Sequence, residues 1–270
     1  MKHKNILFSA IVLAIVVSAS YYGYKLHSYF SIMDEEPAYN CTQNQDDTLR
    51  LSLVGDSWVF LHKPFDHSLA CQLHRVTGVP AEVASCGISR LSSKEVYCSM
   101  FDNEGVQKVL RTGPHYCFVS VGINDSNRKM GTNYYVRHTL YIIRFLLKNH
   151  ITPILLEIPD YDIAYTFTHQ EFRKVLAGRL SMVCNHSSFD CREDYRQALA
   201  EALHAERLAQ QVLMVTHTIF ENRHFTEDRM HLNDKGYAVL DSCIVRQIAN
   251  DIKSHTGLSH SGVTIGNEAE

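Results

Sequence analysis

The sequence predicts an α/β protein, built as a three-layer α/β/α sandwich around a flavodoxin-like, five-stranded parallel sheet. Short apolar runs alternate along the chain with longer amphipathic stretches, as they do when helices cover both faces of a parallel sheet. The chain has 270 residues. Roughly 220 of them remain once the expected N-terminal anchor and linker are set aside, which is enough for a single large core.

The apolar runs give the expected strands, which are 51–54, 81–85, 116–121, 154–158 and 212–215. Helical periodicity is clearest in 134–148, 170–183, 192–210 and 234–252. Pro159 and Gly236 fit a loop and the first turn of the last helix. The range 159–168 is expected to be a loop. Its aromatic side chains either line a sugar or acyl site or only pack locally; they are Tyr161, Tyr165 and Phe167.

The N-terminus carries a membrane-directed signal, because Lys2, His3 and Lys4 precede an uncharged apolar stretch over 6–24. A stretch of about 19 residues is long enough to span a bilayer. The residues before Ser20 also resemble a signal-peptidase site. Charges on the two sides of the stretch favour a cytoplasmic N-terminus. We therefore expect the protein to be anchored with its domain outside the cytoplasm, or secreted or periplasmic if the signal is cleaved.

The expected organisation is an anchor or signal peptide over 1–25, a polar linker over 26–47, one domain over 48–253 and a flexible tail over 254–270. The formal net charge is −3, and the chain shows no basic stripe and no phosphate-binding glycine loop. Nucleic acid is therefore not expected as a partner. Membrane contact is expected through the N-terminal segment alone.

The eight cysteines and sixteen histidines raise the question of a metal site. The nearest approaches to ligand spacing are Cys71 with His74 and Cys184 with His186, but a structural zinc site usually shows two paired clusters. We therefore expect neither a metal nor another cofactor. If the domain lies outside the cytosol, Cys184 and Cys191 are the best candidates for a disulfide.

Three polar motifs follow or lie near expected strand ends, where open α/β sheets place their sites. They contain Ser57, the pair Asn124 and Asp125, and the pair Asp228 and His231. A serine hydroxyl becomes an effective nucleophile when a histidine takes its proton, a carboxylate holds that histidine and donors face the developing oxyanion. Each motif alone also fits a turn or a capped helix entry.

Together the motifs resemble those of the SGNH (GDSL-like) hydrolases, a family of serine esterases and lipases, over 51–253. The first block is Gly55-Asp56-Ser57, the third is Gly122-Ile123-Asn124-Asp125, and the last runs from Asp228 to His231. The looser second block contributes Gly87. Gly55-x-Ser57-x-Val59 lacks the second glycine of the α/β-hydrolase nucleophile elbow, which favours the smaller flavodoxin-like sheet.

The resemblance implies that Ser57 is the nucleophile and His231 the general base, oriented by Asp228. The oxyanion would be held by the backbone N–H groups of Ser57 and Gly87 and by the side-chain amide of Asn124. Gly87 suits this role because a residue without Cβ lets a substrate approach the main chain. Asp125 is expected to brace its loop rather than to react.

The implied function is hydrolysis of an O-acyl ester, in particular an O-acetyl ester, on a carbohydrate or another small ester substrate. Two alternatives stay open. One is an O-acyltransferase that acts on a glycan, because an acyl-enzyme is resolved by water or by an alcohol. The other is a catalytically silent domain that binds a glycan or a partner. The sequence gives no indication of the oligomeric state.

Overall fold

The computed structural model describes residues 2–31, 40–41, 46–62 and 66–256. Within them lies one sheet of five parallel strands in the order β2-β1-β3-β4-β5. The strands are β1 Leu49–Gly55, β2 Ala81–Gly87, β3 Tyr116–Ser120, β4 Thr152–Leu156 and β5 Leu213–Val215. Much of the expected linker (32–39 and 42–45) and most of the expected tail (257–270) lie outside the described residues.

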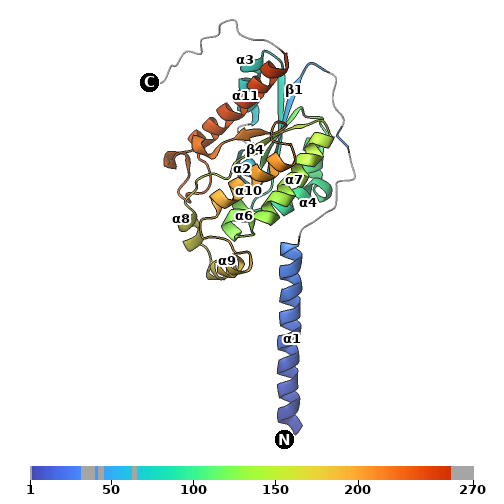
Figure 1. Cartoon of the computed structure of the whole chain (residues 1–270), viewed down its shortest axis with the longest axis vertical. Coiled ribbons are helices and arrows are strands. Elements are labelled where there is room, and N and C mark those ends of the chain that lie inside the picture. The colour runs from blue at the N-terminus through green and yellow to red at the C-terminus, as the bar shows by residue number, and fades with distance from the viewer. Residues whose placement is uncertain (1, 32–39, 42–45, 63–65, 257–270) are drawn as a thin grey trace.

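Helices cover both faces of the sheet and so form the predicted three layers (Figure 1). One face is packed by α3 Asp66–Thr77 and α11 Asp234–Thr256, and the other by α4 Ser93–Asp102, α5 Glu104–Leu110, α7 Thr132–Lys148 and α10 Arg192–Ala205. The described part of the domain also contains four short or peripheral α-helices, namely α2 Ser57–His62, α6 Ile123–Arg128, α8 Ile163–Thr168 and α9 Phe172–Cys184. The core lies on both sides of the three interior strands, β1, β3 and β4, which are buried almost throughout.

An additional helix, α1 Lys2–Phe30, projects away from the domain (Figure 1). Its described apolar side chains are exposed, among them Leu13 and Val17. The helix ends against α4, where Lys94 Nζ donates hydrogen bonds to the carbonyl and the hydroxyl of Ser31. Over the residues that the structure describes, no helix combines the length and the apolar character required to cross a membrane.

The range 159–168, expected to be a loop, contains the short helix α8. Asp162 starts this helix, because its side chain accepts a hydrogen bond from the backbone N–H of Tyr165. The side chains of Tyr161 and Phe167 are buried, whereas Tyr165 stacks on His169. The structure therefore favours the local-packing interpretation of these aromatic residues.

The expected disulfide between Cys184 and Cys191 is wrong, because all eight cysteines are free thiols. Cys184 ends α9 and is exposed. Cys191 is buried, and its thiol points at the carbonyl oxygen of Ser126 from 3.4 Å. The two side chains therefore belong to different environments, one in solvent and one against α6.

Candidate active site

Ser57, Asn124 and His231 come from three distant parts of the chain and meet at the carboxyl edge of the sheet. Ser57 is the first residue of α2, directly after β1, and Asn124 lies in α6, which follows β3. His231 lies in the loop that precedes α11. Gly55 permits the close approach of β1 to β3, since a Cβ there would lie 2.4 Å from the carbonyl oxygen of Ser120.

The imidazole of His231 connects Ser57 with Asp228. Nε2 of His231 lies 2.9 Å from Oγ of Ser57, and Nδ1 lies 2.5 Å from Oδ2 of Asp228. The other carboxylate oxygen, Oδ1, accepts hydrogen bonds from the backbone N–H groups of Met230 and His231 and from the hydroxyl of Thr226. The structure thus brings together the three residues that the sequence singled out as a hydroxyl, a base and an acid.

The electrostatics of this group favour an ionised Asp228. Partial burial raises the pKa of its carboxyl, but the hydrogen bonds from His231, Met230 and Thr226 outweigh burial and lower the pKa to about 2. A carboxylate at this position is able to hold Nδ1–H of the imidazole and to stabilise an imidazolium.

Asn124 contacts Asp56, the residue before Ser57, and is held by its neighbours. Its Nδ2 donates to the carbonyl of Leu91 over 3.0 Å and to Oδ2 of Asp56 over 3.3 Å. Asp56 is fully buried and also accepts hydrogen bonds from Ser120 Oγ and from the backbone N–H of Trp58. Burial raises the pKa of Asp56 to about 6, against the opposing effect of these hydrogen bonds. The longer contact to Asp56 leaves one amide proton of Asn124 only weakly bound.

Gly87 ends β2 opposite Gly55, but the space beside its Cα is occupied by the backbone of α2. A Cβ on Gly87 would lie 2.0 Å from the backbone nitrogen of Phe60. The missing side chain therefore lets α2 pack against β2, which is a different reason from the substrate approach that the sequence suggested.

Arg90, in the loop after β2, adopts the left-handed region, with φ of 69°. Sequence reasoning missed this position because arginine does not indicate such a conformation.

Asp125 braces the site, as the sequence predicts. Its carboxylate accepts two hydrogen bonds from Ser93, one from the backbone N–H over 2.8 Å and one from the hydroxyl over 2.5 Å. Both residues are buried, and burial raises the pKa of Asp125 to about 6. This contact ties α6, which carries Asn124, to the first turn of α4.

The loop that carries His231 is fixed by contacts that sequence reasoning missed. The backbone N–H of Asp162 donates to the carbonyl of Arg229 over 3.0 Å, and the Arg229 guanidinium donates to the Asp162 carboxylate over 2.8 Å. The same guanidinium lies over the ring of Tyr165, 4.4 Å from its centroid. Within the loop, the backbone N–H of Thr226 donates to the carbonyl of His231. His231 is therefore presented by a loop that is anchored to α8.

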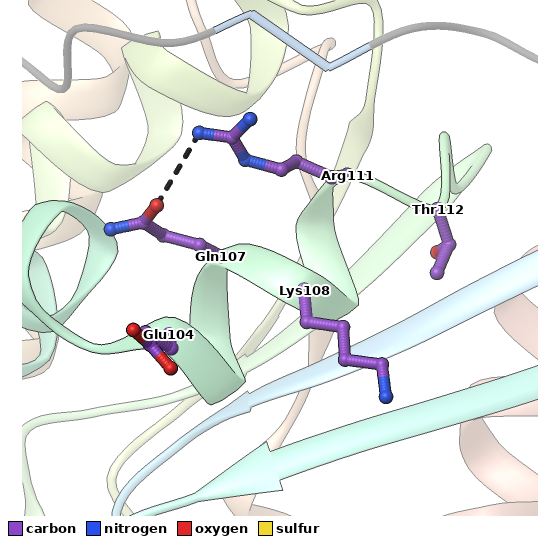
Figure 2. Close-up of a pocket in the computed structure, with 5 residues that line it drawn as sticks. All are labelled: Glu104, Gln107, Lys108, Arg111 and Thr112. Carbon is purple, nitrogen blue, oxygen red and sulfur yellow. Dashed lines mark hydrogen bonds between the residues drawn. The ribbon is translucent and has the colours of Figure 1, made fainter.

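A surface hollow lies apart from this group of residues. The hollow, of about 340 Å³ on and after α5, is lined by exposed or half-buried side chains, and Gln107 accepts a hydrogen bond from Arg111 across it (Figure 2). None of its lining residues belongs to the Ser57 site. In the described part of the chain, no group of three or more His, Cys, Asp or Glu side chains is arranged to hold a metal ion.

Comparison with known proteins gives a match in structure alone. No protein-family model and no curated protein matches the sequence. A lipase/acylhydrolase from Enterococcus faecalis superposes with a TM-score of 0.54 at 15% identity, over 75% of this chain and 96% of that one. A protein assigned to the G-D-S-L family of lipolytic proteins, from Desulfitobacterium hafniense, gives 0.52 at 14% identity, over 73% and 98%.

A third solved structure is a variant of an acetyl-xylooligosaccharide esterase from Geobacillus, with a TM-score of 0.51 at 15% identity, over 74% of this chain and 94% of that one. In each of the three comparisons, the match covers nearly the whole length of the solved structure. Their fold is the one that the motifs around Ser57, Asn124 and His231 indicate. The chain therefore has the SGNH (GDSL-like) hydrolase fold.

Proposed function

We propose that this chain is a serine ester hydrolase in which Ser57 is the nucleophile, His231 the general base and Asp228 the residue that orients the base. The observation that carries the proposal is the continuous contact from the Ser57 hydroxyl through both nitrogens of His231 to Asp228, over 2.9 and 2.5 Å. Positioned groups of this kind convert a weak hydroxyl nucleophile into an effective one.

In the proposed reaction, Oγ of Ser57 attacks the ester carbonyl while its proton passes to Nε2 of His231. The negative charge that forms on the carbonyl oxygen is stabilised by the backbone N–H groups of Ser57 and Gly87 and by the Asn124 amide. His231 then gives its proton to the departing alcohol, which leaves an acyl group on Ser57. Water, deprotonated by His231, attacks this acyl group, releases the carboxylic acid and restores the hydroxyl.

The proposed substrate is an O-acyl ester, specifically an O-acetyl ester on a carbohydrate. Similarity in fold to the acetyl-xylooligosaccharide esterase supports this choice. The exposure of the site supports it too, since the side chains of His231 and Asp228 are 25% and 52% exposed. The imidazole is therefore accessible from solvent, while the side chain of Ser57 beside it is buried at 5% exposure.

The test is hydrolysis of p-nitrophenyl acetate, p-nitrophenyl palmitate and acetylated xylo-oligosaccharides by the full chain. We expect release from both acetyl substrates, little from the palmitate, and none from Ser57→Ala. Ser89→Ala, which changes an exposed serine of the neighbouring loop, is the matched control and should keep the wild-type rate. Equal rates for Ser57→Ala and the wild type would exclude the proposed nucleophile.

We also propose that the domain lies outside the cytoplasm. This location is supported by the basic residues Lys2 and Lys4 before an uncharged apolar stretch and by the acidic residues after it. Protease added to intact cells that produce the chain should degrade the domain. Complete protection until the cells are lysed would contradict this location.

A further inference from the structure

Helix α9 has its apolar face turned to the solvent. Four apolar side chains recur at intervals of four, four and three residues and therefore share one face of the helix. Their exposed fractions are 79% for Phe172, 48% for Leu176, 60% for Leu180 and 74% for Val183. We call these four residues the α9 stripe. A surface helix of a globular domain normally directs such a face into the core.

The opposite face of α9 attaches the helix to the domain through small and polar residues. Gly178 packs so closely on Phe167 that a Cβ would lie 2.6 Å from its ring. The buried Ser181 donates a hydrogen bond to the carbonyl of Lys129 over 2.7 Å, and Asn185 donates to the same carbonyl over 2.8 Å. The helix is thus docked in a defined orientation, which keeps the stripe outward.

The charged side chains within α9 are all positive. The helix contains Arg173, Lys174 and Arg179 and no acidic residue, and Glu171 at its N-cap pairs with Lys174 over 3.3 Å, which leaves the two arginines as the basic residues beside the stripe. At 100° per residue, Arg173 and Arg179 fall on the two sides of the stripe. A helix with an apolar face flanked by basic residues is typical of segments that lie in the interface of an anionic membrane. We infer that α9 binds an anionic lipid surface, with the α9 stripe inserted between headgroups and the arginines on lipid phosphates.

The size of the stripe favours lipid over a second copy of the chain. A helix of 13 residues is about 20 Å long and about 10 Å wide, a footprint of about 200 Å². A stable protein interface needs about 800 Å² on each partner. Insertion of a few apolar side chains together with electrostatic attraction is sufficient for reversible membrane binding.

The position of α9 in the molecule agrees with this occupant. In Figure 1, α9 lies at the lower end of the domain, the end at which α1 meets it. The described apolar side chains of α1 are exposed as well, Leu13 to 64%. Two helices with exposed apolar side chains therefore lie at one end of the molecule.

The inference is tested on the full chain with an environment-sensitive fluorophore, NBD, attached to Cys184. This exposed thiol lies four residues after Leu180, at the edge of the stripe. Cys71→Ser removes the other exposed thiol. Because α1 also carries exposed apolar side chains, the readout is the environment of the fluorophore on α9 and not co-sedimentation of the chain.

We expect a blue shift and a several-fold gain in emission with vesicles of phosphatidylcholine and phosphatidylglycerol, and a smaller change with phosphatidylcholine alone. Leu176→Ser with Leu180→Ser should require at least about tenfold more lipid for the same change. Arg173→Glu with Arg179→Glu should abolish the preference for anionic vesicles. Val76→Ser, which changes an exposed apolar residue of α3, is the matched control and should leave the response unaltered.

Emission that stays the same with and without vesicles would overturn the inference. So would a blue shift that depends on protein concentration without lipid, because a second copy would then occupy the stripe. Neither readout involves ester hydrolysis, so the result stands whether or not Ser57 is a nucleophile.

Discussion

Oδ2 of Asp228 lies 2.5 Å from Nδ1 of His231, while Oδ1 of the same carboxylate accepts hydrogen bonds from two backbone N–H groups of its own loop. Asp228 therefore orients the imidazole and fixes the loop that carries it. A substitution of Asp228 therefore tests catalysis separately from folding only if it keeps an oxygen at the position of Oδ1 to accept these two hydrogen bonds.

Asp228→Asn is such a substitution. The amide keeps one oxygen for the backbone N–H groups but presents an NH2 group to His231, which favours the wrong tautomer of the imidazole. We expect kcat to fall about ten-thousand-fold, with circular dichroism and thermal unfolding close to the wild type. Glu227→Gln, at the exposed neighbouring residue, is the control. Unchanged kinetics in Asp228→Asn would remove Asp228 from the proposed triad.

Asn124→Ala tests the proposed oxyanion donor. In the proposed mechanism the Asn124 amide donates to the oxyanion, and its loss removes stabilisation in the transition state alone. We expect kcat on p-nitrophenyl acetate to fall on the order of 100-fold to 1000-fold with little change in KM. Asn127→Ala alters the same helix, where the side chain contacts Gln170, and should keep near-normal kcat. A similar loss in both variants would point to damage of α6 instead.

The sequence predicts the sheet and the site because both depend on local patterns. Each strand is an apolar run, and the motif residues follow strand ends, so parallel pairing brings them to one edge. The boundaries shift by one or two residues where pairing extends a strand, as in β1, which ends at Gly55 rather than Val54. Helix α10 ends at Ala205, before the predicted 210, because Arg207 adopts a left-handed conformation with φ of 58°. The sequence has no glycine at this position to indicate the end of the helix.

Tertiary contacts are what the sequence does not reveal. Periodicity predicts a helix over 170–183 but does not tell which face packs, and α9 turns its apolar face outward. The contact of Asp162 with Arg229 joins residues 67 positions apart. The proximity of Cys184 and Cys191 in sequence suggested a bond, whereas the structure directs one thiol to solvent and buries the other.

The free thiols lead to a prediction about reduction. A reducing agent should leave the melting temperature of the full chain unchanged, and so should Cys184→Ser, because this thiol is exposed. Cys191→Ser should lower the melting temperature, since it places a hydroxyl in a buried position shaped for a thiol. Equal losses of stability on reduction and in both variants would indicate that Cys184 and Cys191 form a disulfide.

Asp56 predicts a pH dependence of stability. Burial raises the pKa of its carboxyl from 3.8 to about 6 in the folded protein. Between these values the folded state binds more protons than the unfolded state, so the free energy of unfolding decreases as the pH rises from about 4 to about 6. The contribution of Asp56 is about 3 kcal/mol, present in full below this range and lost above it. Burial raises the pKa of the Asp125 carboxyl in the same way, so its titration adds to the decrease in the free energy of unfolding with pH.

Denaturant unfolding of Asp56→Asn at a series of pH values measures this contribution. The slope between about pH 4 and pH 6 should become shallower but not vanish, because Asp125 still titrates. Asp102→Asn, an exposed position on α4, should keep the wild-type slope. If Asp56→Asn also keeps the wild-type slope, Asp56 does not take up a proton on folding in this range.

Gly87→Ala separates the two reasons for a glycine at the end of β2. The added Cβ would lie 2.0 Å from the backbone nitrogen of Phe60 and 2.5 Å from the backbone carbon of Val59, and neither strand nor helix can move away without disturbing Ser57. Overpacking a core typically costs about 1–3 kcal/mol. We expect Gly87→Ala to lower the free energy of unfolding by about 3 kcal/mol or more. Activity should fall in proportion to the folded fraction and also through displacement of α2. Gly78→Ala, where no atom lies within 4 Å but φ is +74°, should cost only about 1–2 kcal/mol and leave kcat intact. A Gly87→Ala protein that unfolds like the wild type but has lost kcat would show that the glycine is required for the approach of the substrate and not for the packing of α2.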